Sequence, residues 1–400
     1  MITVQEADQL IFQDIKKYPS IRIALQEAFG MVLREDLLAD RDLPPFHRVT
    51  MDGIGINFDE WKKGNKAFSI EGTQKAGSPL QDLKDAKACI EVMTGAVLPG
   101  GCDCVVPVED IEVKNGKAAL REGLDLSRMQ NVHQHASDHK RGDCLVEKGC
   151  RLLAPQVAVA ASIGKTEVLV STTPKIAVIG TGDELVGLDQ QPEAYQFRQS
   201  NSYALQSALN LHGYKHVERF HINDDQSELE GKLGKIIADF DVLILSGGVS
   251  MGKYDLVPEA LKASGIGIVF HKVKQRPGKP FWFGRNKKGK PVFALPGNPV
   301  STQICVYRYV LPFLNRALGA CEVPEEFASL SEDVEIKTDL TYFLPVRIET
   351  ERNGCLVAKP IFPNGSGDFA SLAKSDGFIE LPADTYKFTK GTTARLYRWS

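Results

Sequence analysis

The stretch VLILSGGVSMG, at residues 242–252, decides the fold. Its first part, Val242–Ser246, is an almost wholly apolar run, which is typical of a buried strand in a parallel sheet. The glycines that follow let backbone amides approach an anion closely, although a Gly-Gly turn on its own is more often a simple turn. We therefore predict a buried strand that runs into a candidate phosphate-binding loop.

Strand and helix patterns alternate on both sides of this stretch. Apolar runs predict further strands over 175–179, 217–222 and 266–273, and a hairpin over 281–295. Helical patterns occupy 201–212, 226–239, 255–264 and 299–318. Alternation of this kind predicts a parallel α/β sheet with helices on its faces.

The remaining segments have other textures. An amphipathic helix is predicted over 4–17, a second helix over 19–29 and an alanine-rich helix over 154–163. Residues 46–136 and 325–400 consist of short apolar runs between turns, which predicts two β-rich regions. The chain is thus expected to be a multidomain α/β and β protein.

Composition excludes several classes of protein. The chain has 400 residues, of which 43% are hydrophobic, 25% charged and 8% aromatic, and this usage is globular rather than disordered, collagenous or coiled-coil. A net charge of −3 gives no general attraction to nucleic acid or to an anionic membrane. Eight cysteines without disulfide spacing, no signal-peptide pattern and no long apolar run predict a reduced, cytoplasmic protein.

Charged residues gather where the predicted strands end. Asp183 and Glu184 follow one strand, and Asp225 follows another. Arg276 and Lys279 flank a proline-rich turn, and the segment 296–299 directs a helix N-terminus to the same edge. Taken singly, these features are open to plainer interpretations, as a helix cap or a solvated loop. Together they predict a site for a phosphorylated ligand and a divalent metal at the carboxyl edge of the sheet.

The first β-rich region adds candidates whose chemistry is open. Asp52 lies on a constrained loop and Thr94 at a strand end, and turn chemistry is the favoured interpretation of both. The segment HQHASDH, at 133–139, has metal-binding residue types, but a polar interdomain linker is favoured over a metal site. Cys102 and Cys104 are interpreted as half-buried strand residues.

Seven short motifs follow one another along the chain: DLPPF at 42–46, MDG at 51–53, MTGA at 93–96, TGDE at 181–184, SGGVS at 246–250, PGKP at 277–280 and LPGNPVS at 295–301. In this order they resemble the molybdopterin molybdenumtransferase family, which includes MoeA and the E-domain of gephyrin. The resemblance covers nearly the whole chain. It implies a helical stem (1–44 and 137–173), an inserted β domain (45–136), a MogA-like molybdopterin-binding α/β domain (174–321) and a C-terminal β barrel (322–400).

The resemblance also implies an activity in molybdenum cofactor biosynthesis. Molybdate enters adenylylated molybdopterin, and molybdenum cofactor and AMP leave, with magnesium or zinc as the metal. Family members are homodimers whose active sites combine the α/β domain of one protomer with the inserted domain of the other. The resemblance implies transient contact with the adenylyltransferase and with molybdoenzymes. It implies no binding to nucleic acid or to a membrane.

Three sets of site residues follow from this resemblance. The catalytic set is Asp52, Thr94, Asp183, Glu184 and Lys279. The ligand-binding set is Gly247, Gly248, Val249, Ser250, Arg276, Pro296, Asn298, Pro299 and Ser301. The metal set is Glu184, Asp225 and Asp255, beside Asp183.

Other functions stay open at this point. A CinA-like or MogA-like enzyme would share the α/β domain but would lack the MDG insert and the C-terminal β domain. A scaffold that holds molybdopterin without turnover has no need of the acidic residues at 183, 184 and 255. The sequence departs from the family pattern around MDG, at 199–201 and at 131–141. A divergent paralogue with weak or altered activity is therefore the alternative.

Overall fold

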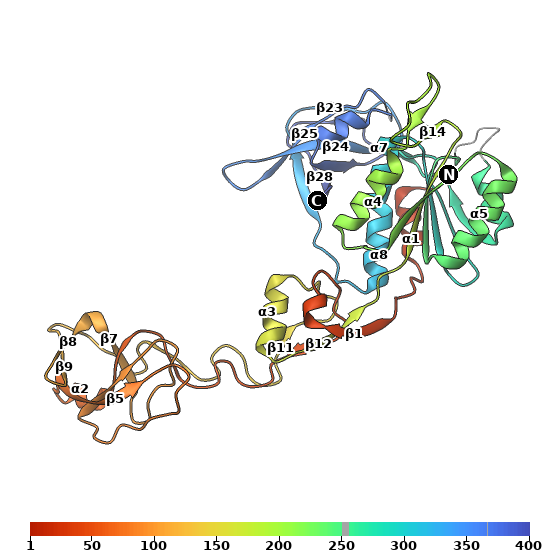
Figure 1. The fold of residues 1–400 in the computed structure, drawn as a ribbon. Helices are drawn as coiled ribbons and strands as arrows, with labels where there is room; N and C mark the ends of the chain where they lie inside the picture. Colours follow the sequence, from red (N-terminus) through yellow and green to blue (C-terminus); the bar gives the residue numbers. More distant parts are fainter. Residues whose placement is uncertain (250–255, 366) are drawn as a thin grey trace. The chain divides into compact units, whose positions relative to one another are not determined.

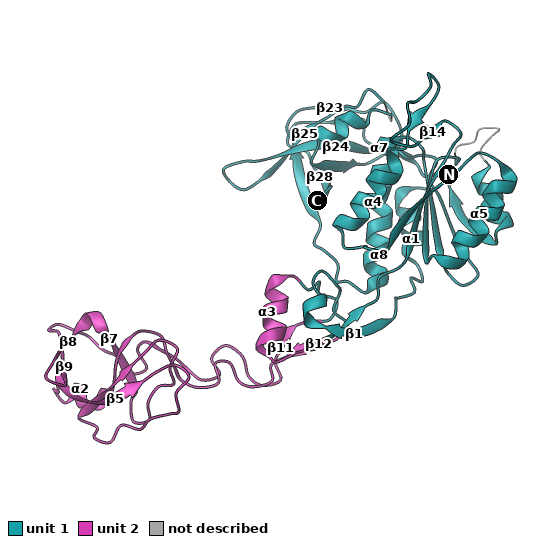
Figure 2. Ribbon diagram, viewed as in Figure 1, with its two compact units in different colours: residues 1–34, 148–152, 168–400 teal, residues 35–147, 153–167 magenta. Residues whose placement is uncertain are grey.

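The computed structural model describes residues 1–249, 256–365 and 367–400. These residues form two compact units, which Figure 2 distinguishes by colour. The first unit comprises residues 1–34, 148–152 and 168–400, and the second comprises 35–147 and 153–167. The four-part division implied by the resemblance is finer than these two units and stays a prediction.

A six-stranded sheet forms the centre of the first unit (Figure 1). Its order is β16 (Val217–Ile222), β13 (Ile176–Thr181), β17 (Val242–Ser246), β21 (Pro291–Leu295), β20 (Trp282–Asn286) and β18 (Ile266–His271). The first four strands are parallel, and the last two pair antiparallel. The predicted parallel sheet and the hairpin over 281–295 are thus confirmed.

Helices cover both faces of this sheet because successive strand residues point to opposite sides. Val178 joins the core on one face, whereas its neighbours Ala177 and Ile179 join the core on the other. The first face carries α1 (Val4–Phe12), α4 (Asn201–Leu211), α7 (Pro299–Cys305) and α8 (Leu311–Leu318). The second carries α5 (Gln226–Asp239) and α6 (Val257–Ala263). A π-helical segment, Val306–Val310, joins α7 to α8, so the helix predicted over 299–318 is present.

The C-terminal strands close into a five-stranded barrel. Their order is β24 (Thr341–Thr350), β25 (Leu356–Pro360), β22 (Glu326–Leu330), β28 (Thr393–Arg398) and β26 (Gly377–Leu381), and β26 pairs back with β24. A short strand from the α/β region, β19 (Gln275–Arg276), pairs with β24 at Thr341 and Tyr342. The 3₁₀ helix η4 (Phe369–Lys374) precedes β26. The predicted barrel is confirmed.

The helix predicted over residues 19–29 is wrong. Ser20–Ala24 forms strand β1, which pairs with β12 (Glu167–Ser171), and Leu25–Glu27 forms a single 3₁₀ turn. The β-branched residues of this short segment favour a strand once a distant partner strand is available. The first helix is also shorter than predicted, because α1 ends at Phe12 and Asp14 adopts a positive φ of 53°.

The second unit is β-rich, as predicted. Its sheet has the order β7 (Cys104–Pro107), β4 (Gly53–Ile56), β6 (Ala88–Val92), β5 (Ala67–Gln74), β9 (Lys117–Leu120) and β8 (Ile111–Lys114). The unit also contains the helices α2 (Phe58–Lys62) and α3 (Ala154–Ser162). Cys102 and Cys104 are buried, more deeply than predicted. Burial raises the pKa of each of these thiols to about 12, so both stay protonated at neutral pH.

The HQHASDH segment forms side-chain pairs within the second unit. Arg48 donates from Nη2 to His133 Nδ1 at 2.9 Å, and His133 Nε2 lies 2.7 Å from Asp138 Oδ1. His135 Nε2 lies 3.2 Å from a carboxylate oxygen of Asp42. Throughout the described ranges, no group of three His, Cys, Asp or Glu side chains is arranged to hold a metal ion. These contacts favour the interpretation of 133–139 as a polar connecting segment.

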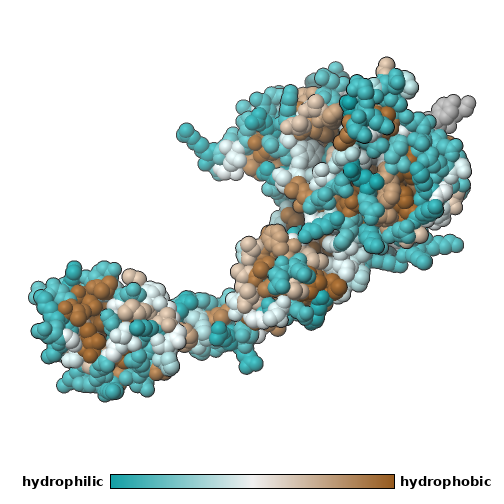
Figure 3. Space-filling model, in the orientation of Figure 1, coloured by the Kyte–Doolittle hydropathy of each residue, from teal (hydrophilic) through white to brown (hydrophobic). Residues whose placement is uncertain are grey.

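Hydrophilic residues cover most of the face shown in Figure 3, and hydrophobic residues gather there in separate patches. Within the described residues, no helix combines the length and the hydropathy needed to cross a membrane.

Candidate functional site

The ends of the four parallel strands lie together at one edge of the central sheet. Gly180 of β13 pairs with Ser246 of β17 and with His221 of β16, and Ser246 pairs with Leu295 of β21. The loops that follow these residues therefore start side by side. In an open parallel sheet this carboxyl edge is the usual place for a ligand.

The glycine loop after β17 depends on the absence of side chains. Gly247 and Gly248 have φ values of +107° and +63°, which L-residues rarely adopt. A Cβ at Gly247 would lie 2.6 Å from the carbonyl oxygen of Thr181, and a Cβ at Gly248 would lie 2.6 Å from Val257 Cγ2. The next residue, Val249, is buried, and its carbonyl accepts a hydrogen bond from His271 Nε2 at 3.0 Å. The loop is thus fixed in a conformation that keeps its backbone accessible.

Thr181 places a hydroxyl beside this loop. The residue is only 3% exposed, and its Oγ1 has no hydrogen-bond partner among the described residues. This oxygen would lie 3.0 Å from a Cβ at Gly248, so it faces the loop. A buried hydroxyl without a partner is costly unless a ligand or water satisfies it.

Asn201, at the start of α4, joins the end of β17 to the segment 296–299. Its Nδ2 donates to Ser246 Oγ at 2.8 Å and to the Gly297 carbonyl at 2.7 Å. Thr302, which is fully buried in α7, donates from Oγ1 to the Pro296 carbonyl at 2.6 Å. These two side chains set the spacing between the glycine loop and the segment 296–299. The sequence prediction missed both as site residues.

The loops enclose a cavity of about 860 Å³ at this edge. Two aromatic residues with largely exposed side chains, Phe197 and Phe369, contribute to its wall. The following predicted site residues line it: Glu184, Gly247, Gly248, Val249, Pro296, Asn298 and Pro299. Its size suits a ligand larger than a mononucleotide fragment.

A second cavity, of about 290 Å³, is lined by Arg276, Lys279 and Ser301. It shares Pro280, Pro296 and Asn298 with the larger cavity. Gln275, which is fully buried, holds the turn from inside by donating to the carbonyls of Pro277 and Gly278 at 3.3 and 3.2 Å. The turn therefore presents two cations from a fixed backbone beside the main cavity.

Asp52 and Thr94 contact each other in the second unit. The Asp52 carboxylate accepts hydrogen bonds from Thr94 Oγ1 at 2.6 Å and from the Thr94 amide at 2.7 Å. These bonds, with the hydroxyl contributing most, lower the pKa of the Asp52 carboxyl. Asp52 is therefore held as an oriented, exposed anion. The sequence analysis favoured a role in forming a turn, and this geometry also allows Asp52 to act on a ligand.

Comparison with known proteins places this geometry in a family. The chain matches three family models: the MoeA N-terminal region (domain I and II) over residues 2–164, a probable molybdopterin binding domain over 177–316 and the MoeA C-terminal region (domain IV) over 328–399. It is 38% identical to a molybdopterin molybdenumtransferase from Synechocystis sp., with both chains covered completely. This chain belongs to the molybdopterin molybdenumtransferase family.

Further relatives agree with this assignment. A molybdopterin molybdenumtransferase from Staphylococcus epidermidis is 30% identical over 397 residues, which are 98% of this chain and 94% of that protein. The solved structure of a molybdopterin biosynthesis MoeA protein from Pyrococcus horikoshii has a TM-score of 0.83 and 25% identity, with both chains covered completely. The predicted family and fold class are confirmed.

The acidic residues predicted for the site of this molybdenumtransferase have different surroundings in the structure. Glu184 lines the main cavity. Asp183 accepts a hydrogen bond from the Asp224 amide at 3.0 Å, and Asp225 caps α5 by accepting the Glu228 amide at 2.8 Å. Asp225 is thus seen in the helix-capping role that the sequence left open. Ser250 and Asp255 lie outside the described residues.

Proposed function

We propose that the protein inserts molybdate into adenylylated molybdopterin and releases AMP and molybdenum cofactor. The observation that carries the proposal is the glycine loop of a molybdenumtransferase chain, which opens into a cavity of about 860 Å³. The half-buried residues Gly247 and Gly248, which line the cavity without side chains, and the Thr181 hydroxyl suit phosphate oxygens. The phosphoanhydride of the substrate is the bond that is cleaved when AMP leaves.

The metal in this proposal is Mg²⁺, with Zn²⁺ as the other choice. Glu184 fits it, because the residue lines the phosphate cavity and hard cations prefer oxygen ligands. Asp183, Asp225 and Asp255 are the other acidic residues proposed for this ion. In the described structure, however, Asp183 accepts the Asp224 amide and Asp225 caps α5, and these two form no metal-binding group with Glu184. When bound, the ion would neutralise negative charge on the phosphoanhydride.

We assign molybdate to the smaller cavity. Arg276 and Lys279 offer two cations to an oxyanion, and Ser301 lies on the same wall. Because this cavity shares Pro296 and Asn298 with the phosphate cavity, one ligand can reach both. The dithiolene end of the substrate would therefore lie toward Lys279.

The complete site in this proposal belongs to a homodimer in the cytoplasm. The α/β domain of one protomer, together with its C-terminal region, supplies the phosphate and molybdate cavities. The other protomer supplies Asp52, which Thr94 holds ionised and oriented. Transient partners would be the adenylyltransferase that makes the substrate and the molybdoenzymes that receive the product.

The proposed activity is tested by AMP release. Purified protein, adenylylated molybdopterin and magnesium are expected to release AMP only after molybdate is added, and a chelator is expected to stop release until magnesium is restored. AMP is measured by chromatography. Binding of the adenylylated pterin without molybdate-dependent AMP release would overturn the proposal and favour a binding protein or a divergent paralogue.

Lys279→Ala is expected to weaken the use of molybdate. Loss of one charge-assisted hydrogen bond corresponds to roughly a 10- to 100-fold rise in KM for molybdate, with a smaller change in kcat. The deficit in AMP release relative to wild type should grow as the molybdate concentration is lowered. Lys274→Ala is the matched control, since Lys274 is an exposed lysine nearby in the sequence that lines neither cavity. If the two variants depend on molybdate concentration equally, Lys279 has no role in molybdate binding.

A further inference from the structure

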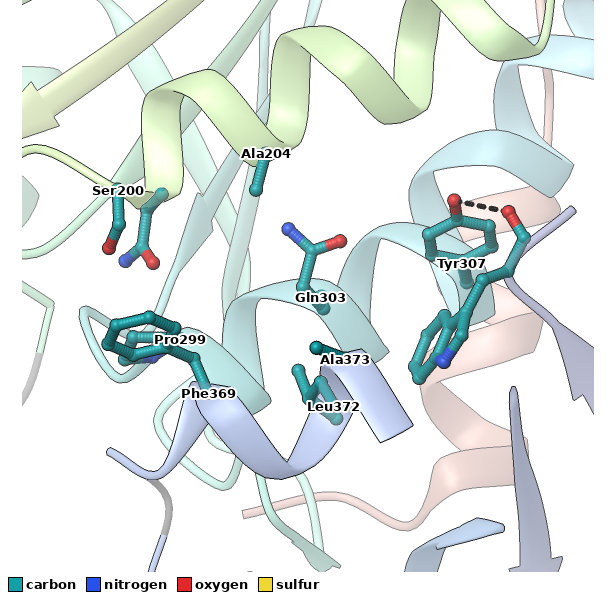
Figure 4. Close-up of a pocket in the computed structure, with 10 residues that line it drawn as sticks. Ser200, Ala204, Pro299, Gln303, Tyr307, Phe369, Leu372 and Ala373 are labelled. Atoms are coloured by element: carbon teal, nitrogen blue, oxygen red, sulfur yellow. Dashed lines mark hydrogen bonds between the residues drawn. The ribbon is translucent and has the colours of Figure 1, made fainter. Parts of the chain in front are cut away.

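A third cavity, of about 280 Å³, adjoins the phosphate cavity on another side. It lies between α4, α7 and η4, as Figure 4 shows. The two cavities share Ser200, Asn201, Pro299 and Phe369. A ligand whose phosphates occupy the glycine loop can therefore extend a further group into this space.

The far wall of this cavity is aromatic and fixed by hydrogen bonds. Tyr307 donates from its hydroxyl to the Trp399 carbonyl at 2.6 Å, and Trp399 Nε1 donates to Ser375 Oγ at 2.9 Å. The two rings pack edge to face with centroids 5.0 Å apart. Leu372 and Ala373 of η4 supply apolar surface to the same cavity. Walls of this kind, already rigid, suit a flat ring.

The Gln303 amide enters this mainly apolar space. Figure 4 shows the Gln303 amide projecting from α7 into the gap between α4 and η4, with its nitrogen on the side of Ala204 and Ser200. The Gln303 Nε2 atom is buried and finds no hydrogen-bond partner in the part of the chain that the structure describes. An amide carries two donors and one carbonyl acceptor, and leaving a buried donor unpaired costs free energy. The Gln303 amide nitrogen is therefore available to pair with a ligand atom or a water molecule.

We propose that this cavity receives the adenine ring of the adenylylated substrate and that Gln303 recognises the ring edge. A glutamine amide pairs with the adjacent donor and acceptor of adenine, N6 and N7, through two hydrogen bonds. The pocket offers aromatic and aliphatic walls to the ring faces. Gln303 is in this assignment a specificity-determining residue for the nucleotide half of the substrate.

The positions of the three cavities favour adenine over the pterin. The cavity with Arg276 and Lys279 adjoins the phosphate cavity at Pro280, Pro296 and Asn298, whereas the Gln303 cavity adjoins it through an entirely different set of residues. In the substrate, the phosphates lie between the dithiolene-bearing pterin and the adenosine. If molybdate meets the dithiolene near Lys279, the adenosine extends the other way. This step rests on the proposed function.

The test compares AMP with ribose 5-phosphate, which keeps the phosphate and sugar but lacks the base. Dissociation constants are measured by calorimetry for the wild type, Gln303→Met and Ala204→Phe. Methionine keeps the length of glutamine without its amide, and phenylalanine at Ala204 fills the cavity from α4. We expect the wild type to bind AMP more tightly than ribose 5-phosphate. Gln303→Met should weaken AMP about tenfold and leave ribose 5-phosphate unchanged. Ala204→Phe should reduce AMP binding to the level of ribose 5-phosphate.

Two results would overturn the assignment. If neither variant changes the preference for AMP, or if the wild type shows no such preference, adenine does not occupy this cavity. If the variants instead weaken molybdopterin without its adenylyl group and spare AMP, the pterin ring occupies it. Molybdate-dependent AMP release by the wild type is measured separately, so a failure of the adenine assignment is distinguishable from a failure of the proposed function.

Discussion

Gly247→Ala is expected to lower molybdate-dependent AMP release at least about a hundredfold, as removal of one preorganised hydrogen-bond donor does in other sites. A Cβ at this position would lie 2.6 Å from the Thr181 carbonyl oxygen, which is main chain and cannot rotate away. The loop must then shift, and its amides leave the place where the phosphate would bind. The measurement is the rate of AMP release at saturating substrate and molybdate.

The control for this substitution is Gly265→Ala. Gly265 also has a positive φ, +81°, but a Cβ there would meet no atom within 4 Å. Gly265→Ala is expected to lose about 1–2 kcal/mol of folding stability, because an alanine is strained in the left-handed region. Gly247→Ala is expected to lose more, because its Cβ would also meet the main chain of Thr181. Urea unfolding measures this loss. Only Gly247→Ala should lose activity, so equal activity in the two folded variants would contradict a role of the loop in binding phosphate.

The elements that carry this site were predictable because each leaves a local pattern. The run Val242–Ser246 is apolar since β17 is buried on both faces, and the glycines after it are required by positive φ values. The helix over 226–239 agrees with α5 at both ends, and Asp225 caps its start. By contrast, Ser20–Ala24 is a strand only through β12, which lies far along the chain.

The residues that organise the cavities leave no such pattern. Asn201 acts through a hydrogen bond to Gly297, which lies almost a hundred residues away in the sequence. Thr302 acts through a hydrogen bond to the nearby Pro296 carbonyl. Neither contact has a sequence signature. Gln275 looks like an ordinary polar residue, yet it is buried and supports the turn beneath Lys279. Gln303 lies in an apolar helix, and its unpaired amide is visible only once α4 and η4 are in place. Tertiary contacts set these roles, so sequence spacing could not predict them.

A mixture of Asp52→Ala and Gly247→Ala chains is expected to recover activity that neither variant has alone. In a twofold-symmetric dimer with shared sites, random pairing makes half of the dimers heterodimers. Each heterodimer then has one site with both residues intact and one site with both altered. The mixture should therefore reach about a quarter of wild-type AMP release. If each site lies within one chain, mixing restores nothing.

The reciprocal mixture gives the decisive comparison, because it predicts a loss rather than a gain. In this experiment, a chain that carries both Asp52→Ala and Gly247→Ala is mixed with an equal amount of wild type. If sites are shared between protomers, each of the two sites in a heterodimer then contains one altered residue. Only wild-type homodimers then act, and activity is about a quarter of that of the same amount of wild type. Sites contained in single chains would instead retain about half, since every wild-type chain stays active. Variants differing in an affinity tag allow exchange between dimers to be measured directly. A value of one half in the exchanged mixture, or a fully active monomer in solution, would place Asp52 outside a site shared between protomers.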